Sequence, residues 1–143
     1  MKIIKDPVHG YIDVEEFIIP LLDSPFLQRL RHIKQLGFSY LVYPGANHTR
    51  FEHSLGTMYL ADIMCRQLGV PGDERALVLA AALLHDIGHG PYSHSIEPVM
   101  REFTGMEHHD ISGLVEDDSI ALSLGAIGTT PGELAGVVGG KHR

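Results

Sequence analysis

The chain has 143 residues, of which 44% are hydrophobic and 20% are charged, and its formal net charge at pH 7 is −7. This length suits one domain with an ordinary core, and the acidic balance provides no basic field of the kind that nucleic-acid binding requires. The single cysteine, Cys65, excludes an intramolecular disulfide and a zinc site built from cysteines. We therefore expect one cytoplasmic domain over residues 1–143, with no signal peptide and no membrane segment.

Apolar spacing, turn residues and capping residues predict the elements in chain order. They are strands over residues 2–5 and 11–14, helices over 15–22 and 25–36, an extended piece over 40–43, a helix that Thr49 or Asn47 caps and that ends near Leu68, a central helix over 72–84, and helices over 95–103, 107–116 and 131–138. The fold class predicted from these elements is all-α with a short β-like segment at the N-terminus.

The last predicted helix lies in a weakly apolar part of the chain. Residues 122–140 are rich in glycine and alanine and contain no aromatic side chain. We therefore expect the helix over 131–138 to have little to pack against. This leads to the expectation that a following part, with which it would build a core, is missing.

The central helix ends in the feature around which the sequence is organised. Nine consecutive apolar residues, Ala76–Leu84, lead directly into His85 and Asp86, and Gly88 then allows the backbone to turn. A helix that is apolar all round is buried, and this one is far shorter than the about 20 residues that span a bilayer. A buried imidazole and carboxylate need a partner, and a divalent cation suits both. The alternative is a histidine stabilised by the helix dipole beside an exposed Asp86.

Two further histidine-bearing segments favour the metal interpretation. They are Arg50–Gly56 (RFEHSLG) and Glu107–Ser112 (EHHDIS), and the segment after the central helix is itself HDIGHGPYSH. Two imidazoles and one carboxylate, from His53, His85 and Asp86, would hold one divalent ion and leave coordination positions open. This spacing alone does not choose between hydrolysis and other metal chemistry.

The remaining polar residues of these segments suit a phosphorylated substrate. An unperturbed histidine titrates near neutral pH, so His89, His94 and His108 are candidate acid–base groups around the ion. Arg50 lies one helical turn before His53, on nearly the same face, and is a candidate phosphate clamp.

These motifs resemble those of HD-domain phosphohydrolases. The similarity extends to the dNTP triphosphohydrolase branch, which includes the dGTPases and the SAM-and-HD-domain proteins, and it covers roughly residues 4–112. The motifs that carry it are DPVHG at 6–10, DSPFLQRLR at 23–31, IKQLG at 33–37, YPGA at 43–46, RFEHSLG at 50–56 and LLHDIGHGPYSH at 83–94.

The resemblance implies an HD-domain helical bundle, cleavage of a nucleotide with release of triphosphate, and self-association into homo-oligomers. The implied site residues are His53, His85 and Asp86 as metal ligands, His89 and His108 near the α-phosphate with His94 close by, Arg50 on a phosphate, Gln35 and Leu36 at the sugar and base, and Asp23, Gln28 and Arg31 at a regulatory nucleotide. Regulated members of the branch bind that nucleotide at an oligomer interface.

Two departures from the family pattern leave alternatives open. His109 stands where the family has a glutamate, and the family's last metal ligand, an aspartate, lies beyond the end of this chain. The alternatives to a triphosphohydrolase are a non-catalytic or truncated module that binds metal or nucleotide, another HD-type nucleotidase or phosphodiesterase, or a non-haem iron oxygenase. The divalent metal ion stays open among Fe, Mn, Ni, Mg, Co and Zn, because mixed nitrogen and oxygen ligands select poorly.

Overall fold

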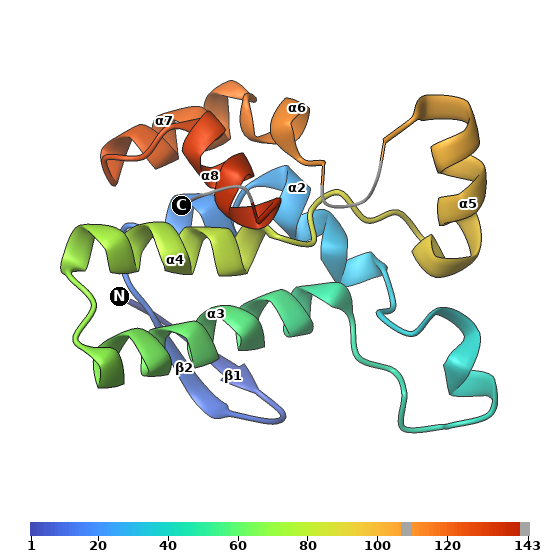
Figure 1. The fold of residues 1–143 in the computed structure, drawn as a ribbon. Coiled ribbons are helices and arrows are strands. Elements are labelled where there is room, and N and C mark those ends of the chain that lie inside the picture. Colours follow the sequence, from blue (N-terminus) through green and yellow to red (C-terminus); the bar gives the residue numbers. More distant parts are fainter. Residues whose placement is uncertain (107–109, 141–143) are drawn as a thin grey trace.

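A computed structural model of the protein describes residues 1–106 and 110–140 and confirms the all-α fold class (Figure 1). An antiparallel hairpin at the N-terminus is followed by helices. The elements are β1 (Lys2–Asp6), β2 (Gly10–Val14), α1 (Ile19–Leu22), α2 (Pro25–Gln28), the 3-10 helices η1 (Arg29–His32) and η2 (Gly37–Leu41), α3 (Arg50–Leu68), α4 (Gly72–Leu84), α5 (Ser93–Thr104), α6 (Ser112–Val115), α7 (Asp118–Ala126) and α8 (Pro131–Val138).

The helices α3 and α4 form an antiparallel pair at the centre of the molecule (Figure 1). Helix α3 begins with a capping box, in which the Thr49 hydroxyl accepts from the Glu52 amide and the Glu52 carboxylate accepts from the Thr49 amide. It ends at Gly69, whose φ of +66° closes the helix in the left-handed conformation. Because the pair is antiparallel, the first turns of α3 lie beside the end of α4.

The apolar run predicted as a buried helix is α4. Leu79, Ala80, Leu83 and Leu84 are buried in the core, and Val78 is the one apolar side chain of the run with more than a third of its surface exposed. The hairpin and helices α1 and α2 contribute to the same core, and α8 packs against α4.

The turn of the hairpin brings His9 against helix α3. One Asp6 carboxylate oxygen accepts from the backbone amides of Val8 and His9, at 2.9 and 2.8 Å, and holds the turn. A Cβ atom at Gly56 would lie 3.2 Å from His9 Nε2, so the missing side chain makes room for this ring. Gly56 lies one helical turn after His53, so this packing borders the predicted metal site.

The predicted helix over 25–36 is wrong beyond its first turn. Helix α2 ends at Gln28, η1 follows, and the chain then runs extended and pairs with the segment before α3. The Ile33 carbonyl accepts from the Arg50 amide at 2.8 Å, and the Gln35 amide donates to the His48 carbonyl at 3.1 Å. These long-range hydrogen bonds replace the intrahelical ones, so tertiary pairing overrides the apolar spacing.

The extended piece predicted over 40–43 is also wrong. Residues 37–41 form η2, and the Ser39 carbonyl accepts from the amides of Val42 and Tyr43 at 3.1 and 2.8 Å. The side chains of Leu41, Val42 and Tyr43 are exposed. Local turns therefore satisfy this backbone without a neighbouring strand.

The C-terminal part is better packed than we expected. Of the helix predicted over 107–116, the described part contains α6 alone, and residues 107–109 lie outside it. Helix α7 was not predicted, and it begins where the Asp117 side chain accepts from the Ser119 amide. The expectation that the last helix has little to pack against is wrong, since Leu134 of α8 is fully buried.

Within the described residues, no helix is both long enough and apolar enough to cross a bilayer.

Candidate metal centre

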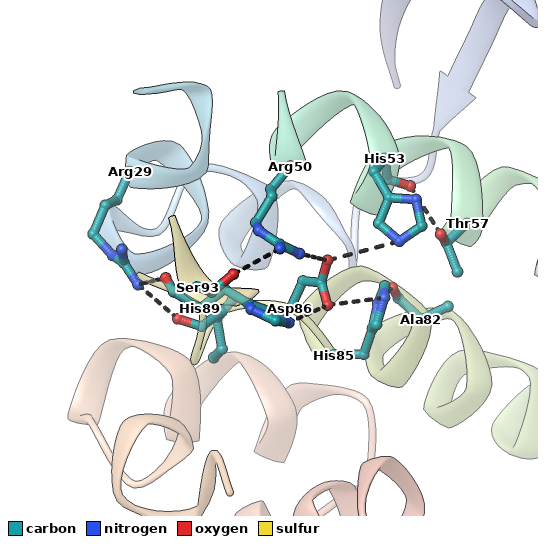
Figure 2. A network of polar contacts seen from close by, with 10 residues as sticks. Arg29, Arg50, His53, Thr57, Ala82, His85, Asp86, His89 and Ser93 are labelled. Carbon is teal, nitrogen blue, oxygen red and sulfur yellow. Dashed lines mark hydrogen bonds and ion pairs between the residues drawn. The ribbon is translucent and has the colours of Figure 1, made fainter. Parts of the chain in front are cut away.

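Three predicted ligands meet where the start of α3 faces the end of α4 (Figure 2). His53 lies in the first turns of α3, His85 caps the C-terminus of α4, and Asp86 follows it. One ligand atom from each residue lies within 4.8 Å of the other two. The antiparallel pairing of α3 and α4 therefore brings together residues that are more than thirty positions apart in the sequence.

The His85 ring is held in the form that a metal ligand needs. Its Nδ1 lies 2.7 Å from the Ala82 carbonyl oxygen. A carbonyl can only accept, so in the neutral ring Nδ1 carries the hydrogen and Nε2 keeps its lone pair. Nε2 lies 3.3 Å from one oxygen of Asp86, on the side where His53 also lies. Histidines that bind metals commonly donate their other ring N–H in this way, which fixes the orientation of the ring.

Asp86 is the buried centre of the polar network. Arg50 Nη1 donates to its Oδ2 at 2.9 Å, and His89 Nε2 lies 3.4 Å from its Oδ1. Burial raises the pKa of the Asp86 carboxyl, but the hydrogen bond from His89 and the electrostatic influence of His85, His89 and Arg50 outweigh burial and hold the pKa well below its usual value. Asp86 is therefore a carboxylate at neutral pH, as a metal ligand has to be.

His53 completes the set on the more open side. Its Nε2 lies 3.7 Å from Asp86 Oδ2, and its ring meets the ring of His85 edge-on. Burial lowers the pKa of His53, the charge of Asp86 raises it, and the electrostatic influence of His85, Arg50 and His48 lowers it further. The neutral imidazole that ligation requires is therefore favoured.

The donor set fits a divalent ion. Metal–ligand bonds of about 2.1 Å keep the donor atoms of one ion within about 4.2 Å of one another, so the three atoms need to approach only slightly. The side chains of His53 and His85 are 35% and 30% exposed, whereas that of Asp86 is 8% exposed. Water and a substrate would therefore reach a bound ion from the side of the two imidazoles.

Arg50 lies closer to Asp86 than its predicted role as a phosphate clamp suggests. Its side chain is buried, Nη1 donates to Asp86, and Nη2 donates to the Ser93 hydroxyl at 2.8 Å. Its Nε–H is buried and has no partner among the described residues. The role on a phosphate stays a prediction, and the observed role is to neutralise the carboxylate.

The other predicted acid–base residues are placed unequally. His89 is buried beside Asp86. His94 falls in the first turn of α5, and its side chain lies outside the described part. His108, with the unusual His109 beside it, lies outside the described residues.

Gln35 and Leu36, predicted at the sugar and base, line a cavity of about 360 Å³. Phe38 and Tyr92 contribute to its wall, and their rings stack with centroids 4.3 Å apart. Ser93 also lines this cavity and accepts from Arg50, which in turn donates to Asp86. Two hydrogen bonds therefore connect the cavity to the candidate metal centre.

The predicted regulatory residues lie at the surface around α2 and η1. Asp23 accepts from Lys2 Nζ at 2.8 Å, and Arg31 donates to the Gln28 side chain at 2.7 Å. The Arg31 guanidinium also lies over the Phe51 ring, 3.7 Å from its centroid. The structure brings Gln28 and Arg31 together, and their binding of a nucleotide stays a prediction.

Sequence reasoning assigned no role to two residues of this network. One guanidinium nitrogen of Arg29, Nη2, donates to the backbone carbonyls of Ile87 and His89 (Figure 2). Ser93 accepts from Arg50, whose other partner is Asp86. Both residues lie within motifs that carry the family resemblance, which was the available signal. Their partners could not be read from spacing, because Arg29 lies 58 residues before Ile87.

Comparisons with known proteins find a family profile and several relatives. The profile of the HD domain matches residues 50–122, which include all three candidate ligands. Deoxynucleoside triphosphate triphosphohydrolase SAMHD1 of Gallus gallus is 43% identical over 123 residues, which cover 78% of this chain and 20% of that protein. The uncharacterized protein YwfO of Bacillus subtilis is 46% identical over 125 residues, which cover 82% of this chain and 28% of that protein.

A solved structure shares this fold. The crystal structure of a hypothetical protein from Aquifex aeolicus superposes with a TM-score of 0.84 at 37% sequence identity, and it covers 99% of this chain and 38% of that chain. The chain spans about a fifth of the length of the SAMHD1 relatives that it matches.

Proposed function

Because this chain belongs to the HD-domain family, we propose that it is a metal-dependent phosphohydrolase that acts on nucleotides, and that it cleaves a dNTP to deoxynucleoside plus triphosphate. The observation that carries the proposal is the His85 ring, which is fixed by Ala82 so that its free Nε2 faces Asp86 and His53. The named activity of the SAMHD1 relatives supports the choice of substrate.

In this proposal, His53, His85 and Asp86 hold a divalent ion at the junction of α3 and α4. When bound, such an ion lowers the pKa of a coordinated water and neutralises charge on a phosphate. Asp86 contributes a full negative charge, because its depressed pKa keeps it ionised at neutral pH. Asp86 is the one anionic ligand of the three, and its charge is shared between the ion and the Arg50 guanidinium.

The side chains around the ligands would receive the phosphates. His89 lies against Asp86 and would hold or donate a proton on the buried side of the site. Of the two hydrogen bonds of Arg50, the one to Ser93 can be replaced by a bond to a substrate, because Ser93 lines the cavity while Asp86 is enclosed. We expect Arg50 to turn its Nη2 from Ser93 to a phosphate oxygen while Nη1 stays on Asp86.

The cavity beside Ser93 would take the rest of the nucleotide. Gln35 offers an amide for hydrogen bonds and Leu36 an apolar surface, as the sugar and base of a nucleotide require. Lys34 also lines this cavity and adds positive charge near the phosphates. The surface around Asp23, Gln28 and Arg31 would hold a regulatory nucleotide between subunits of a homo-oligomer.

A second candidate function is a module that binds metal or nucleotide without turnover. It is favoured by the number of ligands, since the described residues bring three side chains to the site. The family resemblance implies a fourth ligand, an aspartate, and an ion without it has one bond fewer to the protein.

The test is an assay of product identity. The protein, loaded separately with Mn²⁺, Fe²⁺, Co²⁺, Ni²⁺, Mg²⁺ or Zn²⁺, is mixed with each dNTP, and the products are separated by anion-exchange chromatography. We expect deoxynucleoside and triphosphate, loss of both with His85→Ala, and normal turnover with His32→Gln, which alters an exposed histidine of η1.

Other outcomes would replace the proposal. Orthophosphate or a nucleoside monophosphate as product would indicate an HD-type nucleotidase or phosphodiesterase. Oxygen consumption that depends on Fe²⁺ would indicate an oxygenase. Metal binding that His85→Ala abolishes, without turnover of any dNTP, would support the binding module.

A further inference from the structure

The turn that carries Asp86 is attached to a distant part of the chain through Arg29. One guanidinium nitrogen, Nη2 of Arg29, donates to the backbone carbonyl of Ile87 at 2.9 Å and to that of His89 at 2.7 Å (Figure 2). Arg29 is the first residue of η1, which comes 58 residues earlier in the sequence. The contact therefore fixes the position of the turn relative to the N-terminal helices.

This turn needs such support because it lies just beyond the end of a helix. Helix α4 ends at Leu84, and the last carbonyls of a helix have no intrahelical partners. The turn is closed by two backbone bonds, from the Ile87 amide to Leu84 at 3.2 Å and from the His89 amide to Asp86 at 3.1 Å. The positive charge of Arg29 near the C-terminus of α4 also interacts favourably with the helix dipole.

The two carbonyls bracket the residues that define the candidate site. Asp86 precedes Ile87, and His89 carries both a carbonyl bonded to Arg29 and a ring that faces the Asp86 carboxylate. A shift of the turn would move the carboxylate and the imidazole together. The charged group of Arg29 holds the turn through two backbone oxygens.

We propose that Arg29 is a positioning residue for the candidate metal centre: by holding the carbonyls of Ile87 and His89, it fixes the turn that aims Asp86 at His53 and His85. The proposal rests on the metal site of the proposed function, and it adds a residue that does not bind the ion. The two N–H groups on Nη2 of Arg29 lie in a plane and match two carbonyls with a fixed spacing. The ammonium group of a lysine, at the end of a flexible chain, would reproduce this geometry only in part.

The test compares Arg29→Met, which keeps the length and apolar stem but removes every donor, with Arg29→Lys, which keeps the charge. The matched control is Arg66→Met, which alters an exposed arginine that pairs with Asp62 on α3. Three quantities are measured for each: the Tm, the hydrogen-exchange rate of the His89 amide in metal-free protein, and the dissociation constant for Mn²⁺ per folded molecule.

We expect the Arg29→Met variant to exchange the His89 amide at least about tenfold faster, because that amide closes the turn onto Asp86. We also expect its affinity for Mn²⁺ to fall by about tenfold or more, which is the usual effect of removing a group that orients a ligand. Arg29→Lys should recover part of both losses. Arg66→Met should leave both quantities at their native values.

The outcomes separate positioning from simple stabilisation. A lower Tm with an unchanged His89 exchange rate and unchanged Mn²⁺ affinity per folded molecule would overturn the proposal, because Arg29 would then be only a structural tie. If the native protein binds no Mn²⁺ or other divalent ion, the proposed function fails. Faster exchange of the His89 amide in Arg29→Met would then still show that Arg29 holds the turn. Unchanged exchange would overturn that role as well.

Discussion

Replacement of Arg50 by glutamine tests whether this arginine mainly neutralises Asp86. The two side chains are 4% and 8% exposed, and their charged atoms lie 2.9 Å apart. At this distance two unit charges attract by about 6 kcal/mol at an effective dielectric constant of 20, and the loss of solvation offsets much of that gain. Removal of one partner from a buried pair costs about 3 to 5 kcal/mol.

We expect Arg50→Gln to lie at the lower end of that range, at about 3 kcal/mol, because His85 and His89 also face the carboxylate. A loss of this size lowers the Tm by roughly 10 °C for a chain of this length. The assay is urea unfolding followed by circular dichroism in the presence of EDTA, so that loss of metal binding does not contribute.

A double-mutant cycle isolates the pair. In the Asp86→Asn background no carboxylate is left to neutralise, so Arg50→Gln should cost about 2 kcal/mol less there than in the native protein. The control is Arg66→Gln, which removes the ion pairs of an exposed arginine with Asp62 and Glu15 and should cost under about 1 kcal/mol. If Arg50→Gln destabilises the protein no more than this control does, the reading of Arg50 as the neutralising partner is refuted.

Three further predictions follow from described contacts. The folded protein binds fewer protons at Asp86 than the unfolded chain, because the pKa of Asp86 is depressed in the fold. The stability that this carboxylate contributes is therefore complete above about pH 5 and is lost as the pH falls further. This pH dependence should vanish from the unfolding profile of Asp86→Asn. Gly56→Ala should stabilise the protein by about 1 kcal/mol in a His9→Ala background and by less beside the native ring, and equal gains in urea unfolding would contradict the close approach. Thr49→Ala should cost about 1 kcal/mol of unfolding free energy through loss of the capping box, whereas an unchanged midpoint would show that the cap contributes nothing.

The parts of the fold that sequence patterns predicted are those whose stabilising contacts are local. The capping box of α3, the glycine that ends it and the apolar run of α4 each act within a few residues, so their helices were predicted closely. The segment after α2 was predicted wrongly because its backbone pairs with residues 48–50. No local pattern encodes that pairing.

The candidate site shows the same division. The three candidate ligands are chemically distinctive residues, so the sequence alone identifies them as candidates. Arg50 was placed on the correct face, but its contact with Asp86 was not foreseen, since it depends on how α3 meets α4. Arg29 was missed because its partners are backbone carbonyls, which have no identity in a sequence.

The antiparallel pairing of α3 and α4 also links two distances along the chain: the one from His53 to the end of α3 and the one from the start of α4 to His85. His53 stands 15 residues before the end of α3, and His85 stands 13 residues after the start of α4. At 1.5 Å per residue, both lie about 20 Å from the turn that joins the helices. One residue inserted within either helix, between its ligand and that turn, would swing an imidazole by about 100° around its axis. Related chains should therefore vary in the length of the connecting turn, at residues 69–71, while the helical distance to each ligand stays fixed.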